Sequence, residues 1–222
     1  MELVASDIVK LPQVETRHYQ TGERLGGDTT ERQKRLHVYI RDGAIGLRVT
    51  AGRSTSALLD VFGPGRLLPP WLWEATSGWQ SRYATALAAT TTLELPADVF
   101  EREVAAHPSL AASLASVHAW GYAMSLDRLA MLALRDPLRR VAQTLLLLLE
   151  RLSSAPGSPP GARLEVGQDL IAAFAGLSRQ TTNRQLRRLA QAGMTTSQRR
   201  VVDVRDLEAL RGAAAGRRPL GR

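Results

Sequence analysis

The stretch GLSRQTTNRQLRRLA, residues 176–190, gathers arginines without a single acidic residue. A helix that only has to be soluble usually mixes both signs of charge along its exposed face. Arginine can bond guanine through two donors, and asparagine or glutamine can bond adenine in the same way, so these residue types suit the major groove of DNA. The segment therefore predicts a helix with a negatively charged partner, and double-stranded DNA is the partner that we expect.

Projected at about 100° per residue, this helix has two distinct faces. Thr182, Leu186 and Leu189 fall together and form the predicted core face. The opposite side carries Gln180, Arg184, Arg187 and Gln191, with Arg179 and Asn183 flanking them near the N-terminal end. The sequence thus places one side of residues 178–191 in a protein core and the other side against the groove.

The residues around this helix predict a helix-turn-helix. Gln168 to Phe174 reads as a short helix, and Gly176 supplies the turn because glycine tolerates a positive φ. Ser178 is a good N-cap for the second helix, and Gly193 is a plausible terminator. Two helices joined by a tight glycine-containing turn are typical of this motif.

A β-wing is predicted directly after Gly193. In MTTSQRRVVDVRDLEAL, two short β-prone segments flank Arg199 and Arg200, which at the tip could touch the DNA backbone. An ordinary solvated pair of basic helices is the structural alternative for the whole module. The full set of predicted DNA-contacting residues is Ser178, Arg179, Gln180, Thr181, Asn183, Arg184, Arg187, Arg188, Arg199 and Arg200.

The charge of the chain is concentrated in the same region. The 222 residues carry a net charge of +8, and residues 161–222 hold 12 arginines against 5 acidic residues. Only Lys10 and Lys34 are lysines, so the arginine preference itself could reflect a compositional habit. That habit does not explain why acidic residues fail to keep pace in one segment, and the excess indicates a C-terminal module that faces a polyanion.

The preceding part of the chain has another character. Residues 12 to about 105 read as short, glycine-punctuated strands, which suggest a compact barrel or roll. Residues 107–134 then predict one long helix, with Leu110, Leu114, Val117, Gly121 and Met124 at the spacing of a coiled-coil seam. We expect this seam to form a dimer, and the alternative is a helix packed on its own domain. Pro137 ends the run.

The predicted fold is α+β, with an N-terminal jelly-roll-like β-roll, a long dimerisation helix and a C-terminal winged helix-turn-helix. Their expected boundaries are 1–106, 107–135 and 136–222, with the clearest linker at 153–162. The chain has no cysteine, which excludes disulfides, thiolate metal sites and iron–sulfur clusters. It shows neither a signal peptide nor an apolar run long enough for a bilayer, so we expect a cytoplasmic protein without a membrane contact.

On these residues the chain resembles the CRP/FNR family of bacterial transcription regulators. GLSRQTTNRQLRRL is similar to the recognition-helix pattern G-x-S-R-x-T-x-x-R-x-L, and LRRVAQTLLLLL resembles the helix after the dimerisation helix. YQTGERL and YIRDGAIGLRV resemble early strands of the family's roll. The resemblance implies a homodimer that binds palindromic DNA, base reading by Arg179 and Arg184, and RNA polymerase as a partner. Gln180 stands where Glu is usual, which leaves the half-site open.

The resemblance also implies an effector site in the roll. Arg82, in RYATALA, matches the arginine that binds the phosphate of a cyclic nucleotide, with Tyr83 beside it, and Ser125 matches a base-contacting position on the long helix. The glutamate expected for the ribose falls on Pro70, and Glu74 is out of register. Cyclic AMP is therefore a possible effector that we expect to bind weakly, and activity without any effector is the alternative.

Two other classes of function remain as alternatives. The first is a small-molecule-binding roll whose C-terminal module mainly docks protein, which would give no sequence-specific binding to DNA. The second is a β-roll enzyme of cupin type, which would need clustered metal ligands. HVYIRDG offers one histidine without a clustered partner, and no catalytic triad or phosphate-binding loop is visible. We therefore expect no enzyme activity, no metal and no obligatory cofactor.

Overall fold

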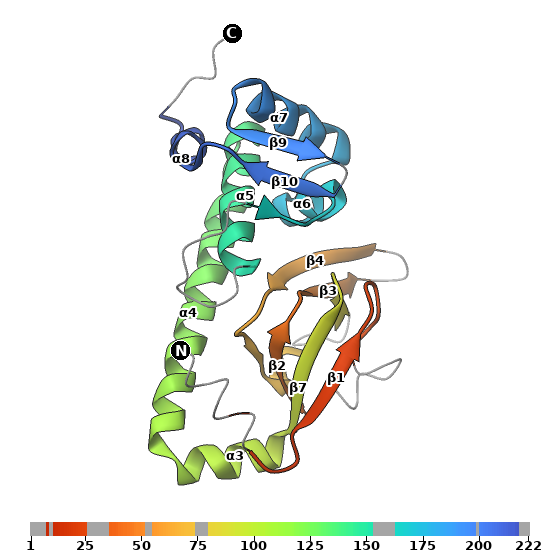
Figure 1. Cartoon of the computed structure of the whole chain (residues 1–222), viewed down its shortest axis with the longest axis vertical. Coiled ribbons are helices and arrows are strands. Elements are labelled where there is room, and N and C mark those ends of the chain that lie inside the picture. The colour runs from red at the N-terminus through yellow and green to blue at the C-terminus, as the bar shows by residue number, and fades with distance from the viewer. Residues whose placement is uncertain are drawn as a thin grey trace. The chain divides into compact units, whose positions relative to one another are not determined.

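Short antiparallel strands separated by tight turns dominate the first part of the computed structural model, as the sequence predicts (Figure 1). The structure describes residues 8, 11–25, 36–51, 55–73, 80–152, 163–198 and 200–217. The predicted linker at 153–162 lies outside them. The described chain divides into two compact units, one up to Tyr122 and one from Ala123 onward.

Two antiparallel sheets build the first unit. One contains, in spatial order, β1 (Glu15–Tyr19), β7 (Thr90–Pro96), β2 (Leu36–Asp42) and β5 (Leu67–Leu68). The other contains β4 (Thr55–Phe62), β3 (Ile45–Ala51) and β6 (Gln80–Ala86), and a short 3-10 helix, η1 (Pro70–Trp73), follows β5. Gly43 makes the β2–β3 turn at φ +89°, where a Cβ would lie 2.4 Å from the Ala89 carbonyl oxygen. The predicted β-roll is confirmed.

Period-two alternation sends the residues of each strand to two different cores. In β2, Val38 and Ile40 join the apolar cluster inside the roll, together with Ile45 and Leu47 of β3. Tyr39, between them, belongs to the cluster that helices cover on the other face of the sheet. The same strand therefore contributes to the roll interior and to the attachment of the helices.

The strand prediction was wrong for the segment after Pro96, because Ala97–Ala106 is a helix, α3. Pro96 stands at its N-cap, and Asp98 in the first turn favours a helix N-terminus. Val99 and Phe100 give α3 an apolar side that is buried against the sheet. The burial of this side stabilises a helix here, although the residues before Pro96 form strands.

The long helix is confirmed as α4 (Pro108–Leu132), but its apolar seam does not have the predicted role. Leu110, Leu114 and Val117 are buried in the same cluster as Tyr39 and Phe100 of the roll. These three residues therefore cover their own domain, and the prediction that they form a dimer contact was wrong. The alternative, a helix packed on its own domain, holds for this face.

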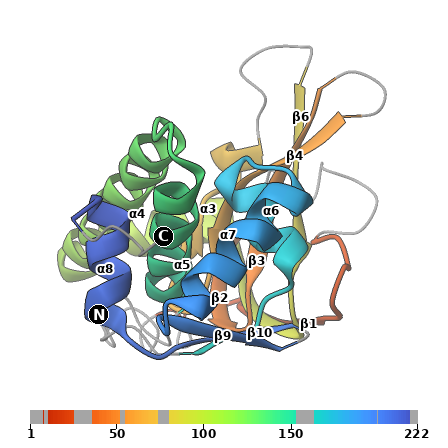
Figure 2. The same ribbon diagram turned by 90° about the horizontal axis from the view of Figure 1, so that it is seen from above.

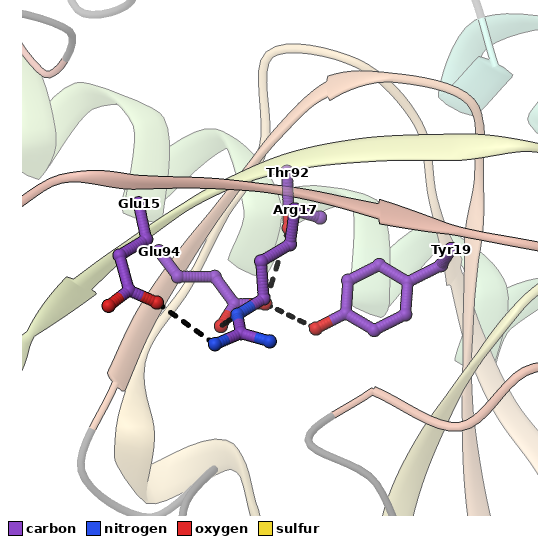
Figure 3. Close-up of polar contacts among 5 residues, drawn as sticks. All are labelled: Glu15, Arg17, Tyr19, Thr92 and Glu94. Atoms are coloured by element: carbon purple, nitrogen blue, oxygen red, sulfur yellow. Dashed lines mark hydrogen bonds and ion pairs between the residues drawn. The ribbon is translucent and has the colours of Figure 1, made fainter.

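A buried carboxylate joins β1 to β7 inside the roll (Figure 3). Glu94 is 3% exposed; its Oε1 accepts hydrogen bonds from the Tyr19 hydroxyl and, at 3.3 Å, from Thr92 Oγ1. Its Oε2 lies 3.3 Å from Arg17 Nε in an ion pair. A charge without partners would be very costly in such a place, so the arginine and the two hydroxyls make this burial possible.

The second unit is built around α5 (Pro137–Leu152), which lies between α8 on one side and α6 and α7 on the other (Figure 2). Asp136 precedes α5, and its Oδ1 accepts a hydrogen bond of 2.9 Å from the Leu138 amide. The remaining elements are β8 (Arg163–Leu164), α6 (Gln168–Ala175), α7 (Arg179–Gln191), β9 (Thr195–Gln198), β10 (Val201–Val204) and α8 (Leu207–Ala215). The strands β8, β10 and β9 form a small antiparallel sheet, so the winged helix-turn-helix is confirmed.

We predict that one histidine makes the first unit sensitive to acid. His37 is buried and stacks on Phe100 with ring centroids 3.9 Å apart; burial, together with the nearby His118, lowers the pKa of His37 from 6.5 to about 4. The unfolded chain then binds more protons than the folded chain between these two values, so stability falls as the pH drops from about 6.5 towards 4. The loss from this group is at most about 3 kcal/mol.

His37→Phe keeps an aromatic ring against Phe100 and removes the titration. Urea unfolding of the wild type and the variant should give curves of unfolding free energy against pH that run parallel above about pH 7 and change their separation towards pH 4, with the variant relatively more stable in acid. Curves that stay parallel down to pH 4 would contradict the assignment to His37.

Candidate nucleic-acid interface

The turn between α6 and α7 has the geometry that its sequence predicts. Gly176 ends α6 in the left-handed region, at φ +62°, and the Leu177 amide donates to the Ala172 carbonyl at 3.0 Å. Ser178 is extended and is the N-cap of α7, where its Oγ accepts a hydrogen bond of 3.1 Å from the Thr181 amide. Because glycine and serine satisfy both helix ends within three residues, the angle between the two helices is set locally.

The two predicted faces of α7 are confirmed. Thr182, Leu186 and Leu189 are buried in the second unit, and Gln185 is buried with them, which the helical projection missed. Gln185 Oε1 accepts a hydrogen bond of 3.0 Å from Arg188 Nη1. The exposed positions of this helix are Arg179, Gln180, Arg184, Arg187, Arg188 and Gln191, while Thr181 and Asn183 are half-buried.

Two guanidinium groups on the exposed face have no partner among the residues that the structure describes. Arg184 and Arg187 make no hydrogen bond or ion pair with any residue of the described part of the chain. No acidic residue belongs to α7 itself. Each group can therefore present its donors to an external acceptor without first leaving an internal one.

An acidic residue nevertheless reaches this face from the preceding helix. Asp169, in the first turn of α6, forms an ion pair through its Oδ1 with Arg179 Nε. Both side chains are largely exposed. Residues 176–190 contain no acidic residue, but the surface that they form does have one beside it. Asp169, ten positions before Arg179 in sequence, lies next to Arg179 in space.

The wing is in place next to these helices. Register pairs Val201 with Gln198 and Val204 with Thr195, so the hairpin turns between Gln198 and Val201. Arg200 is exposed at this turn, whereas Arg199 lies outside the described residues. A side-chain hydrogen bond of 3.5 Å from Gln168 Nε2 to Ser197 Oγ links α6 to β9.

A buried aromatic ring holds the helix-turn-helix to the rest of its unit. Phe174 of α6 is fully buried, and the guanidinium carbons of Arg128 and Arg151 lie 4.7 Å and 5.3 Å from its ring centroid. Arg128 Nη2 also donates to the Phe174 carbonyl at 3.2 Å, and Arg151 Nη2 donates to the Met124 carbonyl at 2.6 Å. The ring is therefore contacted by one cation from α4 and one from α5.

Sequence reasoning found the DNA-facing helix but missed Asp169, Arg128 and Arg151. Asp169 looks like an ordinary acidic residue at a helix N-terminus, where such residues are common. Arg128 and Arg151 lie far from Phe174 in sequence, on two different helices, and each stands next to an acidic residue, as many exposed arginines do. No local spacing distinguishes the two that stack on the ring.

The proposed effector residues lie on several different elements. Arg82 lies on the same side of β6 as Ala84 and Ala86, which belong to the roll interior, and it has no hydrogen-bond or ion-pair partner among the described residues. Tyr83 points to the opposite side, where its hydroxyl lies 2.7 Å from Ser56 Oγ. Ser125 is on α4 in the second unit, Pro70 begins η1, and Glu74 is outside the described residues.

Two further properties of the described residues bear on the function. No group of three or more histidine, cysteine, aspartate or glutamate side chains is arranged there to hold a metal ion. In the same residues, no helix combines the length and the apolar character needed to cross a bilayer.

Comparison with known proteins identifies the second unit independently. Residues 139–213 match the family model described as a Crp-like helix-turn-helix domain. A relative from Mycobacterium tuberculosis, a CRP-like cAMP-activated global transcriptional regulator, is 28% identical over 177 residues, which cover 79% of this chain and 78% of that protein.

Solved structures show the same fold over nearly the whole chain. FixK2 from Bradyrhizobium japonicum superposes with a TM-score of 0.71 at 18% identity, covering 90% of this chain and 96% of that one. A CRP/FNR-family transcriptional regulator from Thermus thermophilus gives a TM-score of 0.68 at 22% identity, covering 92% of this chain and 100% of that one. The domain match shows that residues 139–213 form a Crp-like helix-turn-helix domain, and the superpositions show that the chain shares its fold with these two solved structures.

Proposed function

We propose that the protein is a dimeric regulator that places α7 in the major groove at each half of a palindromic site. The observation that supports this most is the exposed face of α7, where Arg184 and Arg187 have no partner among the described residues and no acid shares the helix. A helix that only has to be soluble usually mixes both signs of charge along its exposed face, so this face favours a polyanionic partner. The proposal includes contact with RNA polymerase, as the family resemblance implies.

Reading and anchoring fall to different residues in this proposal. Arg179 and Arg184 bond guanine, and Gln180 and Asn183 contact bases near the start of the helix. Ser178 and Thr181 at the N-terminus, Arg187 and Arg188 along α7, and the wing residues Arg199 and Arg200 contact phosphates or neighbouring base edges. Phosphate contacts supply affinity and register, whereas base contacts supply the sequence preference.

The dimer contact belongs to a face of α4 other than the one the sequence indicated. Tyr122, Leu126 and Leu129 are 68%, 46% and 61% exposed, and no other large hydrophobic side chains of the described chain are so exposed. They continue a run of exposed alanines at alternating three- and four-residue steps, which is the spacing of a coiled-coil seam. The full seam is Ala112, Ala115, Ala119, Tyr122, Leu126 and Leu129. We propose that this face pairs with its copy.

An anionic effector is proposed for the roll, at Arg82. A guanidinium on the inward side of β6 without a described partner favours a negatively charged ligand there. The curated relative is described as cAMP-activated. Here Pro70 offers neither a carboxylate nor an amide donor to the ribose, so we propose that cyclic AMP binds weakly and that nucleotide-free protein already binds DNA.

The first prediction concerns DNA. Sequences selected by the wild type from random duplexes should contain an inverted repeat with half-sites about one helical turn apart. Arg184→Ala should lose about 1–3 kcal/mol on this site, roughly 5- to 150-fold, and little on a scrambled duplex. Arg179→Ala should behave alike.

Arg200→Ala is the matched control for an arginine that anchors without reading. It should weaken binding to both duplexes alike and reduce the salt slope by about 0.9. If no sequence is enriched, the C-terminal module docks something other than DNA; if Arg184→Ala keeps full discrimination, α7 does not read bases through this residue.

The second prediction concerns assembly. Leu126→Asp should yield monomer in sedimentation experiments at micromolar concentration, because each leucine buried in such a seam contributes about 1.5–3 kcal/mol and a charge there is repelled by its copy. Affinity for the palindrome should fall with it. Ser109→Asp adds the same charge at an exposed position of α4 off the seam and should leave the dimer intact.

Leu114→Asp separates the two faces of α4. Since Leu114 is buried against the roll, this change should lower the unfolding free energy of the first unit. A monomeric wild type, or a dimer indifferent to Leu126→Asp, would contradict the assignment of the seam.

The third prediction concerns the effector. Loss of the ribose acceptor costs about 1–3 kcal/mol, so calorimetry should show cyclic AMP binding roughly 5- to 150-fold more weakly than a site that keeps the carboxylate. Arg82→Leu should abolish this binding, whereas Arg48→Leu, on the opposite side of the same sheet, should not. Submicromolar affinity with strictly nucleotide-dependent DNA binding would overturn this interpretation.

A further inference from the structure

Among the arginines of α7, Arg179 is distinguished by an ion pair to another element. Its Nε contacts Asp169 Oδ1 of α6, although Arg179 is 73% exposed and Asp169 is 66% exposed. Arg188 bonds within the helix to Gln185, and Arg184 and Arg187 have no partner in the described part of the chain. Arg179, which is proposed to bond guanine, is thus held by a carboxylate.

The ion pair does little for the stability of the fold. An exposed pair of this kind is screened by water and salt, and many such pairs contribute nothing measurable to stability. Asp169 in the first turn of α6 also interacts favourably with the helix dipole, but this does not require contact with Arg179. The contact therefore matters for the role of Arg179 more than for the stability of the fold.

The geometry leaves one edge of the guanidinium available. A carboxylate at Nε leaves the Nη1 and Nη2 donors for an acceptor on the other side. Guanine presents two neutral acceptors, O6 and N7, to which arginine bonds bidentately. A guanidinium already held at Nε loses less rotational freedom when it makes these bonds.

The carboxylate also changes the balance between base and phosphate. Phosphate attracts a guanidinium mainly by charge, and this part of the attraction supplies non-specific binding. Beside Asp169 the charge of Arg179 is largely compensated, whereas its hydrogen-bond donors to neutral guanine acceptors remain. The ion pair therefore weakens the contact of Arg179 with phosphate, which every DNA sequence offers, more than its contact with guanine, which depends on the sequence.

We propose that Asp169 is a specificity-determining residue that positions Arg179 for guanine and suppresses its contact with phosphate. The inference rests on the proposed function, because it requires that α7 reads DNA. It assigns a recognition role to a residue of α6, the helix that precedes the turn. Asp169 is a positioning residue in this role and need not touch DNA.

Two substitutions separate charge from positioning. Asp169→Asn keeps an oxygen that can accept from Nε and removes the charge, so on a scrambled duplex binding should strengthen and the salt slope should steepen by about 0.9. Asp169→Ala removes the acceptor as well, so discrimination between the selected site and the scrambled duplex should also fall about tenfold. Glu208→Gln, which breaks an exposed ion pair to Arg211 on α8, is the matched control and should change neither quantity.

A double-mutant cycle decides whether Asp169 acts through Arg179. In the Arg179→Ala background, Asp169→Asn should leave the salt slope and the discrimination unchanged. An equal effect in both backgrounds would mean that the carboxylate only repels phosphate at a distance, and would overturn the proposal. Thermal unfolding should be the same for all variants, which excludes a loss of folding as the cause.

The outcomes distinguish this inference from the proposed function. If selection from random duplexes enriches no sequence, both the proposed function and the proposed role of Asp169 are wrong. An enriched inverted repeat together with wild-type behaviour of Asp169→Asn and Asp169→Ala sinks the role of Asp169 alone and leaves the DNA-binding regulator in place.

Discussion

The burial of one phenylalanine ring determines where the DNA-facing helix can lie. Phe174 closes α6 just before the turn, and Arg128 from α4 and Arg151 from α5 stack on it while Arg128 also bonds its carbonyl. Guanidinium groups can cover an aromatic face and still use their donors, which neither an aliphatic side chain nor a lysine does as well. Since α7 begins only a few residues later, three helices fix its starting point through a single buried contact.

In the roll, the buried Glu94 carboxylate likewise has several polar partners. Glu94 has Arg17, Tyr19 and Thr92 around it, and these contacts tie the first strand to the last strand of the sheet. Arg82, on the inward side of β6, departs from this pattern. Its place on the inward side of β6, without a partner among the described residues, supports the proposal of an anionic ligand there.

Local signals predicted the parts of the fold that depend on neighbours in sequence, and failed where a distant element decides. Gly176, Ser178 and the spacing of Thr182, Leu186 and Leu189 identified the turn, the cap and the buried face of α7, because each depends on a few adjacent residues. The choice between two seams on α4 could not be made in this way. Leu110 and Leu114, in the more apolar seam, pack against the roll. Only the packed structure shows that the alanine-rich face of α4 is the one that stays exposed. The contact between Asp169 and Arg179 could not be predicted from the sequence either, because it joins residues of two different helices.

The basic surface of the second unit is made of arginine alone, since both lysines of the chain, Lys10 and Lys34, lie in its first part. A guanidinium stays protonated at every pH that a cell reaches. Lysine acetylation, which cancels positive charge on many nucleic-acid-binding surfaces, has no target residue here, and arginine methylation leaves the charge in place. Neither modification therefore removes the positive charge that these arginines give the surface, and regulation that leaves this charge in place acts through where the helices are held.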